Sequence, residues 1–208
     1  VFTRPDDAWL DCARSPTVQR MRSGIDSDGN LVSYEHHAAC GWPIPGLAPA
    51  FLYEAVKGTG NVALFSISGA DHWYDIPNQR VRTIENKMIS ETFQPGWLRA
   101  VGAGFVAWPI EQHLDEIAHQ LKRDPVEFRL SMLTGQGKNA GVAPNSEGGA
   151  KRLAAVLKRV GEKANWDQRH QLPKDTGMGV AVITGQERNM PTWVATVARV
   201  KVDRATGS

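Results

Sequence analysis

The sequence predicts an α+β fold, in which strands are followed by a helical segment and then by the start of a second sheet. Residues 17–25 and 31–39 have the mixed apolar and polar pattern of paired strands. Residues 108–165 have helical periodicity instead, and residues 177–184 and 193–203 return to strand-like patterns. Because strands and helices occupy separate parts of the chain, the order is typical of α+β proteins.

The first two strands are joined by residues 26–30, whose sequence DSDGN is a strong turn signal. Its Asp-Gly pair supplies the positive φ values that a tight hairpin needs. His36 and His37 are adjacent on the second strand and should point to opposite faces, so we interpret them as packing or surface histidines. Further along we expect a Pro/Gly-rich loop, a short helix and two strands, over residues 41–50, 51–56, 62–67 and 79–89.

The strongest predicted helix covers residues 108–123, with Pro109 in its first turn. Its apolar residues fall on one stripe, namely Ile110, Leu114, Ile117, Ala118 and Leu121. The sequence from Asp124 to Glu127 is typical of a helix start, with Asp124 as the cap. A third helix is predicted over residues 146–164, with Ser146 as its cap.

Composition excludes some functional classes. The 208 residues suffice for one large domain or two small ones. The 24 basic and 22 acidic residues give a net charge of +2, which argues against a nucleic-acid partner. No apolar run approaches the roughly 20 residues that a membrane span needs. Cys12 and Cys40 form no zinc motif, and we expect free thiols, with a disulfide or a metal site as alternatives.

The two ends of the sequence suggest a longer parent. The chain begins at Val1, and residues 203–208 (DRATGS) look like a turn that leaves a strand. A strand that enters a hairpin turn needs a partner beyond it. We therefore expect a piece of a larger protein, with a small complete domain as the alternative.

One loop has the composition of a ligand-binding segment. Residues 95–105 combine several glycines with a single arginine, Arg99. Glycines allow a backbone to approach a ligand closely, and an arginine can form a forked pair with phosphate or carboxylate oxygens. The alternative is a structural turn in which Arg99 pairs with a nearby carboxylate. The chain contains no GxSxG, P-loop, HExxH or CxxC motif.

Whole motifs carry a resemblance to a known family. The segments FTRPDD, DSDGN, YDIPN, GWLRAVG, the stretch from Glu111 to Ala118, KRDPVEFRLSML and GMGVA follow one another in the chain. In this order they resemble motifs of the molybdopterin-binding subunit of the xanthine dehydrogenase/aldehyde oxidase family. The isoquinoline 1-oxidoreductase beta-subunit type is the more similar branch, and the resemblance spans nearly the whole chain.

The resemblance implies a cofactor site and a reaction. Arg99, Ala100, Val101 and Gly102 match the loop beside the molybdenum cofactor, for which the cytosine dinucleotide form of molybdopterin is expected. Members hydroxylate aldehydes or N-heteroaromatic rings with water as the oxygen source. The expected partners are a small subunit that carries [2Fe-2S] clusters, a cytochrome c as electron acceptor and a small-molecule substrate.

Some family features are missing from this sequence. Purine-oxidising members have an aromatic residue where this chain has Val101, and an arginine that residues 63–68 lack, so a purine substrate is disfavoured. The family's catalytic glutamate lies in a G-x-G-E motif, which this chain does not contain. The resemblance therefore implies no catalytic residue and no metal ligand within the chain, which should be inactive alone.

The expected organisation follows from these points. Residues 1–170 belong to a first molybdopterin-binding domain that includes the helical segment 108–165, and residues 171–208 begin a second, truncated one. The expected function is that of a fragment of an oxidoreductase subunit, and the alternative is a non-catalytic scaffold or binding domain of the same fold. The sequence does not decide between the bacterial periplasm and the cytoplasm.

Overall fold

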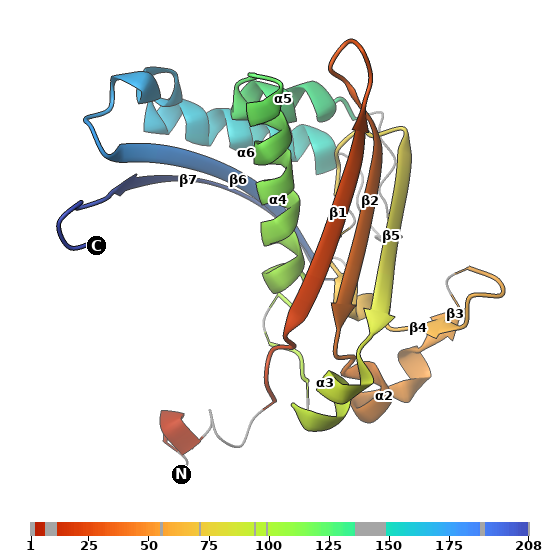
Figure 1. Cartoon of the computed structure of the whole chain (residues 1–208). Helices are drawn as coiled ribbons and strands as arrows, with labels where there is room; N and C mark the ends of the chain where they lie inside the picture. The colour runs from red at the N-terminus through yellow and green to blue at the C-terminus, as the bar shows by residue number, and fades with distance from the viewer. Residues whose placement is uncertain are drawn as a thin grey trace.

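The computed structural model describes residues 3–6, 12–54, 56–70, 72–93, 95–98, 100–135, 149–187 and 190–207, and the side chains of residues 186, 187, 190 and 191 are not described. A three-stranded sheet, a central helix and a two-stranded ribbon follow one another across the molecule (Figure 1). This arrangement confirms the predicted α+β class. Among the described residues, no helix is both long and apolar enough to cross a membrane.

The three-stranded sheet has the order β1-β2-β5. Strands β1 (Thr17–Ile25) and β2 (Leu31–Cys40) form the predicted antiparallel hairpin. In its turn the Asp26 carboxylate accepts hydrogen bonds from the backbone N–H groups of Asp28 and Asn30, and Gly29 has a φ of 78°. Strand β5 (Asn78–Glu85) pairs with β2 in the parallel direction, which the sequence patterns did not indicate.

The connection between β2 and β5 differs from the expected helix and strand. It contains α2 (Ile44–Leu47), the 3-10 turns η1 (Pro49–Phe51) and η2 (Leu64–Ile67), and the short pair β3 (Tyr53–Glu54) and β4 (Asn61–Val62). The helix predicted over residues 51–56 and the continuous strand over 62–67 are therefore wrong. The strand predicted over 79–89 ends early, because the Asn86 side chain accepts a hydrogen bond from the backbone N–H of Ile89 and starts α3 (Lys87–Thr92).

Helix α4 (Ala103–Gln120) lies between the sheet and the ribbon (Figure 1). It begins before residue 108, so Pro109 lies inside the helix and not in its first turn. Pro109 has no N–H to donate to the carbonyl of Phe105. The side chain of Gln19 on β1 supplies the missing donor, with Nε2 2.8 Å from that carbonyl oxygen. The predicted apolar stripe is buried against the core from Ile110 to Ala118.

Two more helices cover the upper end of α4 in Figure 1. Helix α5 (Pro125–Met132) begins at the predicted cap, where the Asp124 carboxylate accepts hydrogen bonds from the N–H groups of Val126 and Glu127. Helix α6 (Gly149–Ala164) buries Leu153 and Leu157, as predicted, whereas the expected cap Ser146 lies outside the described residues. The turn η3 (Trp166–Gln171) then leads to the last two strands.

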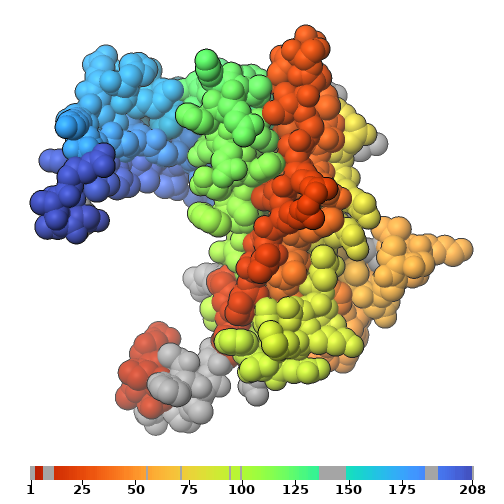
Figure 2. All heavy atoms as spheres, viewed as in Figure 1, coloured from red at the N-terminus to blue at the C-terminus, as the bar shows by residue number. Residues whose placement is uncertain are grey.

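The ribbon consists of β6 (Thr176–Glu187) and β7 (Met190–Lys201), paired antiparallel. It packs against α6 and α4, and the C-terminal end of the chain lies at the left side of the molecule (Figure 2). The hydrophobic core is continuous from the sheet through α4 and α5 to α6 and β6, with Tyr34, Ile110, Phe128, Leu157 and Val182 among its buried members. Helices α4, α5 and α6, the three-stranded sheet and part of the ribbon therefore share one core.

Candidate functional site

The loop before α4 has an unusual backbone. Ala100 has a φ of 73° and Val101 a φ of 43°, which is the left-handed region. Neither is a glycine, and a β-branched residue such as Val101 rarely adopts this conformation. Ala100 is exposed, Val101 is half-buried and Gly102 is buried. Arg99, the residue of this loop on which the sequence-based hypothesis depends most, lies outside the described residues.

Close contacts at two glycines fix the path of this loop. A Cβ atom on Gly96 would lie 2.0 Å from Cβ of Cys12, and one on Gly102 would lie 2.8 Å from the backbone nitrogen of Ser68. Neither position has room for any side chain. These glycines thus let the backbone of the predicted binding loop approach the Cys12 side chain and the Ser68 backbone closely.

Two polar side chains contact the same loop. The guanidinium of Arg14 donates from Nη1 to the carbonyl oxygen of Val101 at 3.0 Å. The backbone N–H of Gly102 donates to Oγ of Ser68, also at 3.0 Å. Both partners are far from the loop in sequence, and no motif identified them.

A hollow beside the loop brings together cationic, hydroxyl and aromatic groups. Its lining includes Arg14, Ser66, Phe65, Trp97 and Val101. The Ser66 hydroxyl is buried and has no hydrogen-bond partner among the described residues. Phe65 and Trp97 are partly exposed and meet edge to face, with ring centres 6.2 Å apart. An unpaired buried hydroxyl has a free energy cost unless a bound group satisfies it. The hollow is therefore suited to a ligand that offers hydrogen-bonding atoms.

A buried ion pair lies farther along α4. The Glu111 carboxylate on α4 accepts hydrogen bonds from Arg129 Nε at 2.9 Å, from the Tyr74 hydroxyl at 2.8 Å and from the backbone N–H of Val182 on β6 at 2.9 Å. Burial raises the pKa of the Glu111 carboxyl, although its three donors oppose the shift. Arg129 is fully buried and also binds Asp115. The Glu111 carboxylate therefore connects α4 to α5, to Tyr74 in the segment before β5, and to strand β6 of the ribbon.

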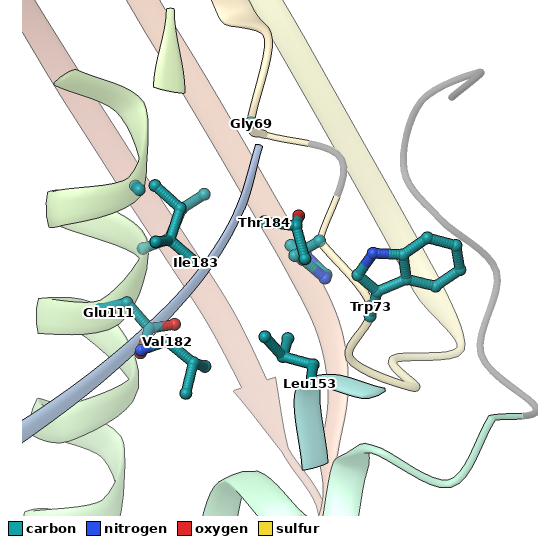
Figure 3. Close-up of a pocket in the computed structure, with 10 residues that line it drawn as sticks. Gly69, Trp73, Glu111, Leu153, Val182, Ile183 and Thr184 are labelled. Atoms are coloured by element: carbon teal, nitrogen blue, oxygen red, sulfur yellow. The ribbon is translucent and has the colours of Figure 1, made fainter. Parts of the chain in front are cut away.

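Sequence reasoning had a signal for this pair but did not use it. Glu111 lies three residues before the buried Leu114, on the apolar side of α4. Arg129 lies among the buried residues of α5, which are Val126, Phe128 and Met132. Charged residues inside two apolar stripes are rarely buried unless they are paired. Figure 3 shows Glu111 beside a small hollow, together with Val182, Thr184 and Trp73.

His36 and His37 lie on opposite faces of β2, as the alternation of a strand predicts. His36 is buried and bonds to Oε1 of Gln19 at 2.7 Å, whereas His37 faces the other way and pairs with Glu35. Burial lowers the pKa of His36 to about 4 and that of His72 to about 3. In the described parts of the chain, no group of three or more His, Cys, Asp or Glu side chains could hold a metal ion.

The two cysteines form no disulfide with each other. Cys40 is buried, whereas Cys12 is half-buried. Burial raises the pKa of the Cys40 thiol to about 11. The Cys40 thiol is therefore neutral at pH 7. The Cys12 side chain leaves no room for a Cβ atom on Gly96.

Comparison with known proteins supports the same family. Residues 1–133 match the molybdopterin cofactor-binding domain. The chain is 49% identical, over 207 residues, to a membrane-bound aldehyde dehydrogenase [pyrroloquinoline-quinone] of Gluconacetobacter polyoxogenes. It is 26% identical, over 208 residues, to isoquinoline 1-oxidoreductase subunit beta of Brevundimonas diminuta. These alignments cover 100% and 99% of the chain but only 26% and 23% of the two relatives.

Solved structures agree at the level of the fold. The aldehyde oxidoreductase from Desulfovibrio desulfuricans covers 82% of the chain with a TM-score of 0.58 and 22% identity, and the match spans 18% of that protein. Quinoline 2-oxidoreductase from Pseudomonas putida 86 covers 82% of the chain with a TM-score of 0.55 and 15% identity, over 22% of its own length. The chain thus spans about a quarter of the curated relatives' length, and it belongs to the molybdopterin cofactor-binding domain family.

Proposed function

We propose that this chain forms one wall of the molybdenum-cofactor site in an oxidoreductase that hydroxylates aldehydes or N-heteroaromatic compounds. The observation that carries the proposal is the strained loop at Ala100 and Val101, which directly follows Arg99 and borders a hollow with an unpaired hydroxyl. Strained backbone that the surrounding fold enforces is often found at functional sites. The family match and the relatives' names support the same assignment.

The residues of this wall fit an anionic, oxygen-rich group. Arg14 brings positive charge to the hollow, and Ser66 has a hydroxyl without a partner among the described residues. The backbone of Ala100, Val101 and Gly102 could lie close to a bound group. Arg99 adds a second cation from the same loop in the sequence. Guanidinium groups suit such partners because they present several donors in a planar fork.

When bound, the molybdenum cofactor supplies the hydroxylation chemistry, in which water provides the oxygen atom and the substrate loses two electrons. This chain contributes binding and orientation, because it lacks the G-x-G-E motif that carries the family's catalytic base. The base, the rest of the cofactor site and the substrate pocket belong to other parts of the complete protein. Residues 1–170 and 171–208 would be parts of two successive molybdopterin-binding domains.

The finer points of the assignment follow the same resemblance. We expect the cytosine dinucleotide form of the cofactor, a small [2Fe-2S] subunit as electron-transfer partner and a cytochrome c beyond it. Two of the similar proteins are themselves named as subunits. Val101 stands where purine-oxidising members have an aromatic residue, so the resemblance disfavours a purine substrate.

The test is Arg99→Ala in the complete protein, with the exposed Arg22 of β1 replaced by alanine as the control. We expect Arg99→Ala to lower the molybdenum content per protein, or the turnover of an aldehyde substrate, by tenfold or more, because a charged hydrogen bond contributes about 1.5–3 kcal/mol. The control should retain both. Unchanged molybdenum content and turnover in Arg99→Ala would remove Arg99 from the site.

The cofactor itself needs a separate measurement. One similar protein is named for pyrroloquinoline quinone, so both molybdenum and extractable quinone should be quantified in the purified wild-type protein. Molybdenum near one equivalent without quinone supports the proposal. Quinone without molybdenum would favour pyrroloquinoline quinone as the cofactor. The absence of both cofactors, together with no oxidoreductase activity, would favour the scaffold alternative.

A further inference from the structure

The conformation of the loop before α4 requires an explanation from the rest of the fold. Ala100 and Val101 are successive non-glycine residues with positive φ, and Val101 is β-branched. Each such residue has a free energy cost of about 1–3 kcal/mol and persists only where the surrounding structure enforces it. Left to itself, the loop would relax into the ordinary right-handed or extended regions.

Arg14 and Ser68 act on a single peptide unit of this loop. The carbonyl of Val101 and the N–H of Gly102 belong to the same planar group. Arg14 donates to its oxygen at 3.0 Å, and Ser68 accepts from its nitrogen at 3.0 Å. A flip of this peptide would break both hydrogen bonds at once, so the pair fixes the rotation of the backbone between Val101 and Gly102.

The neighbouring glycines admit these two partners. A Cβ atom on Gly104 would lie 2.0 Å from Nη1 of Arg14, so any side chain there would displace the guanidinium from the first turn of α4. A Cβ atom on Gly102 would lie 2.8 Å from the backbone nitrogen of Ser68. Only glycine at both positions leaves room for Arg14 and Ser68 to contact the loop. This role is separate from allowing a ligand to approach the backbone.

We propose that Arg14 and Ser68 are positioning residues for the cofactor-facing loop, because they hold both the carbonyl and the N–H of the Val101–Gly102 peptide and so fix the point at which the left-handed Ala100 and Val101 join the start of α4. The statement that the loop faces the cofactor rests on the proposed function above. The hold on the peptide does not, since it depends only on contacts within this chain. In the complete protein, the two residues would set the direction in which Ala100 and Val101 face.

Hydrogen exchange of the cofactor-free complete protein tests the hold directly. The variants are Arg14→Ala, Ser68→Ala and the conservative Arg14→Lys, with Arg22→Ala as the matched control on exposed β1. We expect exchange in residues 95–106 to rise tenfold or more in both alanine variants, because each removes a hydrogen bond that protects the strained peptide. Arg14→Lys should recover part of the protection, since its ammonium retains one donor to the Val101 carbonyl.

The pattern of exchange separates positioning from general stability. Positioning predicts that residues 110–120 of α4 keep their wild-type exchange in all variants. Unchanged exchange in residues 95–106 for both alanine variants would overturn the proposal. An equal rise in residues 110–120 would also overturn it, because Arg14 and Ser68 would then stabilise α4 as a whole.

Molybdenum content distinguishes this inference from the function on which its second half depends. We expect the alanine variants to bind at least threefold less molybdenum than the Arg22→Ala control. If the loop exchanges faster but molybdenum content and KM remain at the control value, the hold is real and the loop does not face the cofactor. If exchange is unchanged, the hold is refuted whatever the molybdenum content.

Discussion

Replacing Arg129 with methionine tests the energetics of the buried ion pair. The change keeps most of the apolar stem of the side chain but removes the guanidinium, which bonds to Oε2 of Glu111, to the Glu111 backbone carbonyl and to the carbonyl of Pro125. The Arg129 side chain is 0% exposed and that of Glu111 is 9% exposed, so water cannot replace the lost donors. Glu111 would remain a buried carboxylate with only Tyr74 and Val182 as donors.

The expected loss is about 3–5 kcal/mol in the free energy of unfolding, which is the usual cost of breaking a buried pair by removing one partner. Asp115→Asn is the matched control, because Asp115 binds the same guanidinium but its side chain is 36% exposed. Solvent screening limits that contribution to less than about 1 kcal/mol. Urea denaturation followed by tryptophan fluorescence measures both values.

The dependence on pH gives a second criterion. Without Arg129, the already raised pKa of Glu111 rises further because its main counter-charge is gone. The folded state then binds a proton that the unfolded state releases above about pH 4.3, so the variant's stability falls as pH rises. The deficit relative to wild type should be smaller at pH 5 than at pH 8.

The stability effects of Arg129→Met and Glu111→Gln should be non-additive. Adding Glu111→Gln to Arg129→Met removes the uncompensated charge, so the double variant should be less destabilised than the sum of the two single variants by about 0.5–3 kcal/mol. A loss below about 1 kcal/mol for Arg129→Met would refute the argument. So would a deficit that is independent of pH, since the cost would then not arise from a buried carboxylate.

Three further outcomes can be checked in the same unfolding assay. Asp124→Ala should lower the free energy of unfolding by about 0.5–2 kcal/mol at pH 7, because it removes the cap of α5. Burial raises the pKa of Asp124, but hydrogen bonds and a nearby arginine outweigh that effect and lower it. The stabilities of wild type and variant should therefore converge as pH falls below about 4, and a constant gap would contradict this. Burial lowers the pKa of His72 to about 3, so His72 should destabilise the wild type by up to about 2 kcal/mol between pH 6.5 and pH 5, in addition to the loss from the buried His36. His72→Phe should abolish the His72 part of this loss, whereas equal slopes in wild type and variant would exclude His72 as a source. Gly96→Ala should destabilise the protein by about 1–3 kcal/mol, because the new Cβ atom would lie 2.0 Å from Cβ of Cys12. Gly177 has open space around it, so Gly177→Ala should change stability little. Equal effects of the two substitutions would show that the close contact at Gly96 is unimportant.

Local signals in the sequence predicted local structure well. The turn at Asp26 and Gly29 and the cap at Asp124 depend on residues only a few positions apart, and the structure confirms both. The stripe on α4 was correct because burial follows the helical period, but the start of the helix was not. The side-chain amide of Gln19 donates a hydrogen bond to the Phe105 carbonyl that Pro109 leaves without its helical donor. Because Gln19 is distant in sequence, the residues around Pro109 do not reveal this partner.

Long-range features were beyond the reach of sequence patterns. The parallel pairing of β2 with β5 joins residues separated by the whole connection between them, and the left-handed conformation of Val101 contradicts its intrinsic preference. The candidate site depended on the resemblance for Arg99, Ala100, Val101 and Gly102. Its supporting residues Arg14 and Ser68 emerged only when the fold brought them to the loop.

The hydrogen bond from Val182 to Glu111 has a consequence for recombining this protein with its relatives. The family match ends at residue 133, but the Glu111 carboxylate accepts a donor from strand β6, far beyond that boundary. Because the donor is a backbone N–H, almost any residue except proline serves at position 182. A chimera joined at residue 133 should therefore tolerate a foreign β6 sequence, provided that the graft preserves the strand's register against α4 and the inserted ribbon carries no proline there.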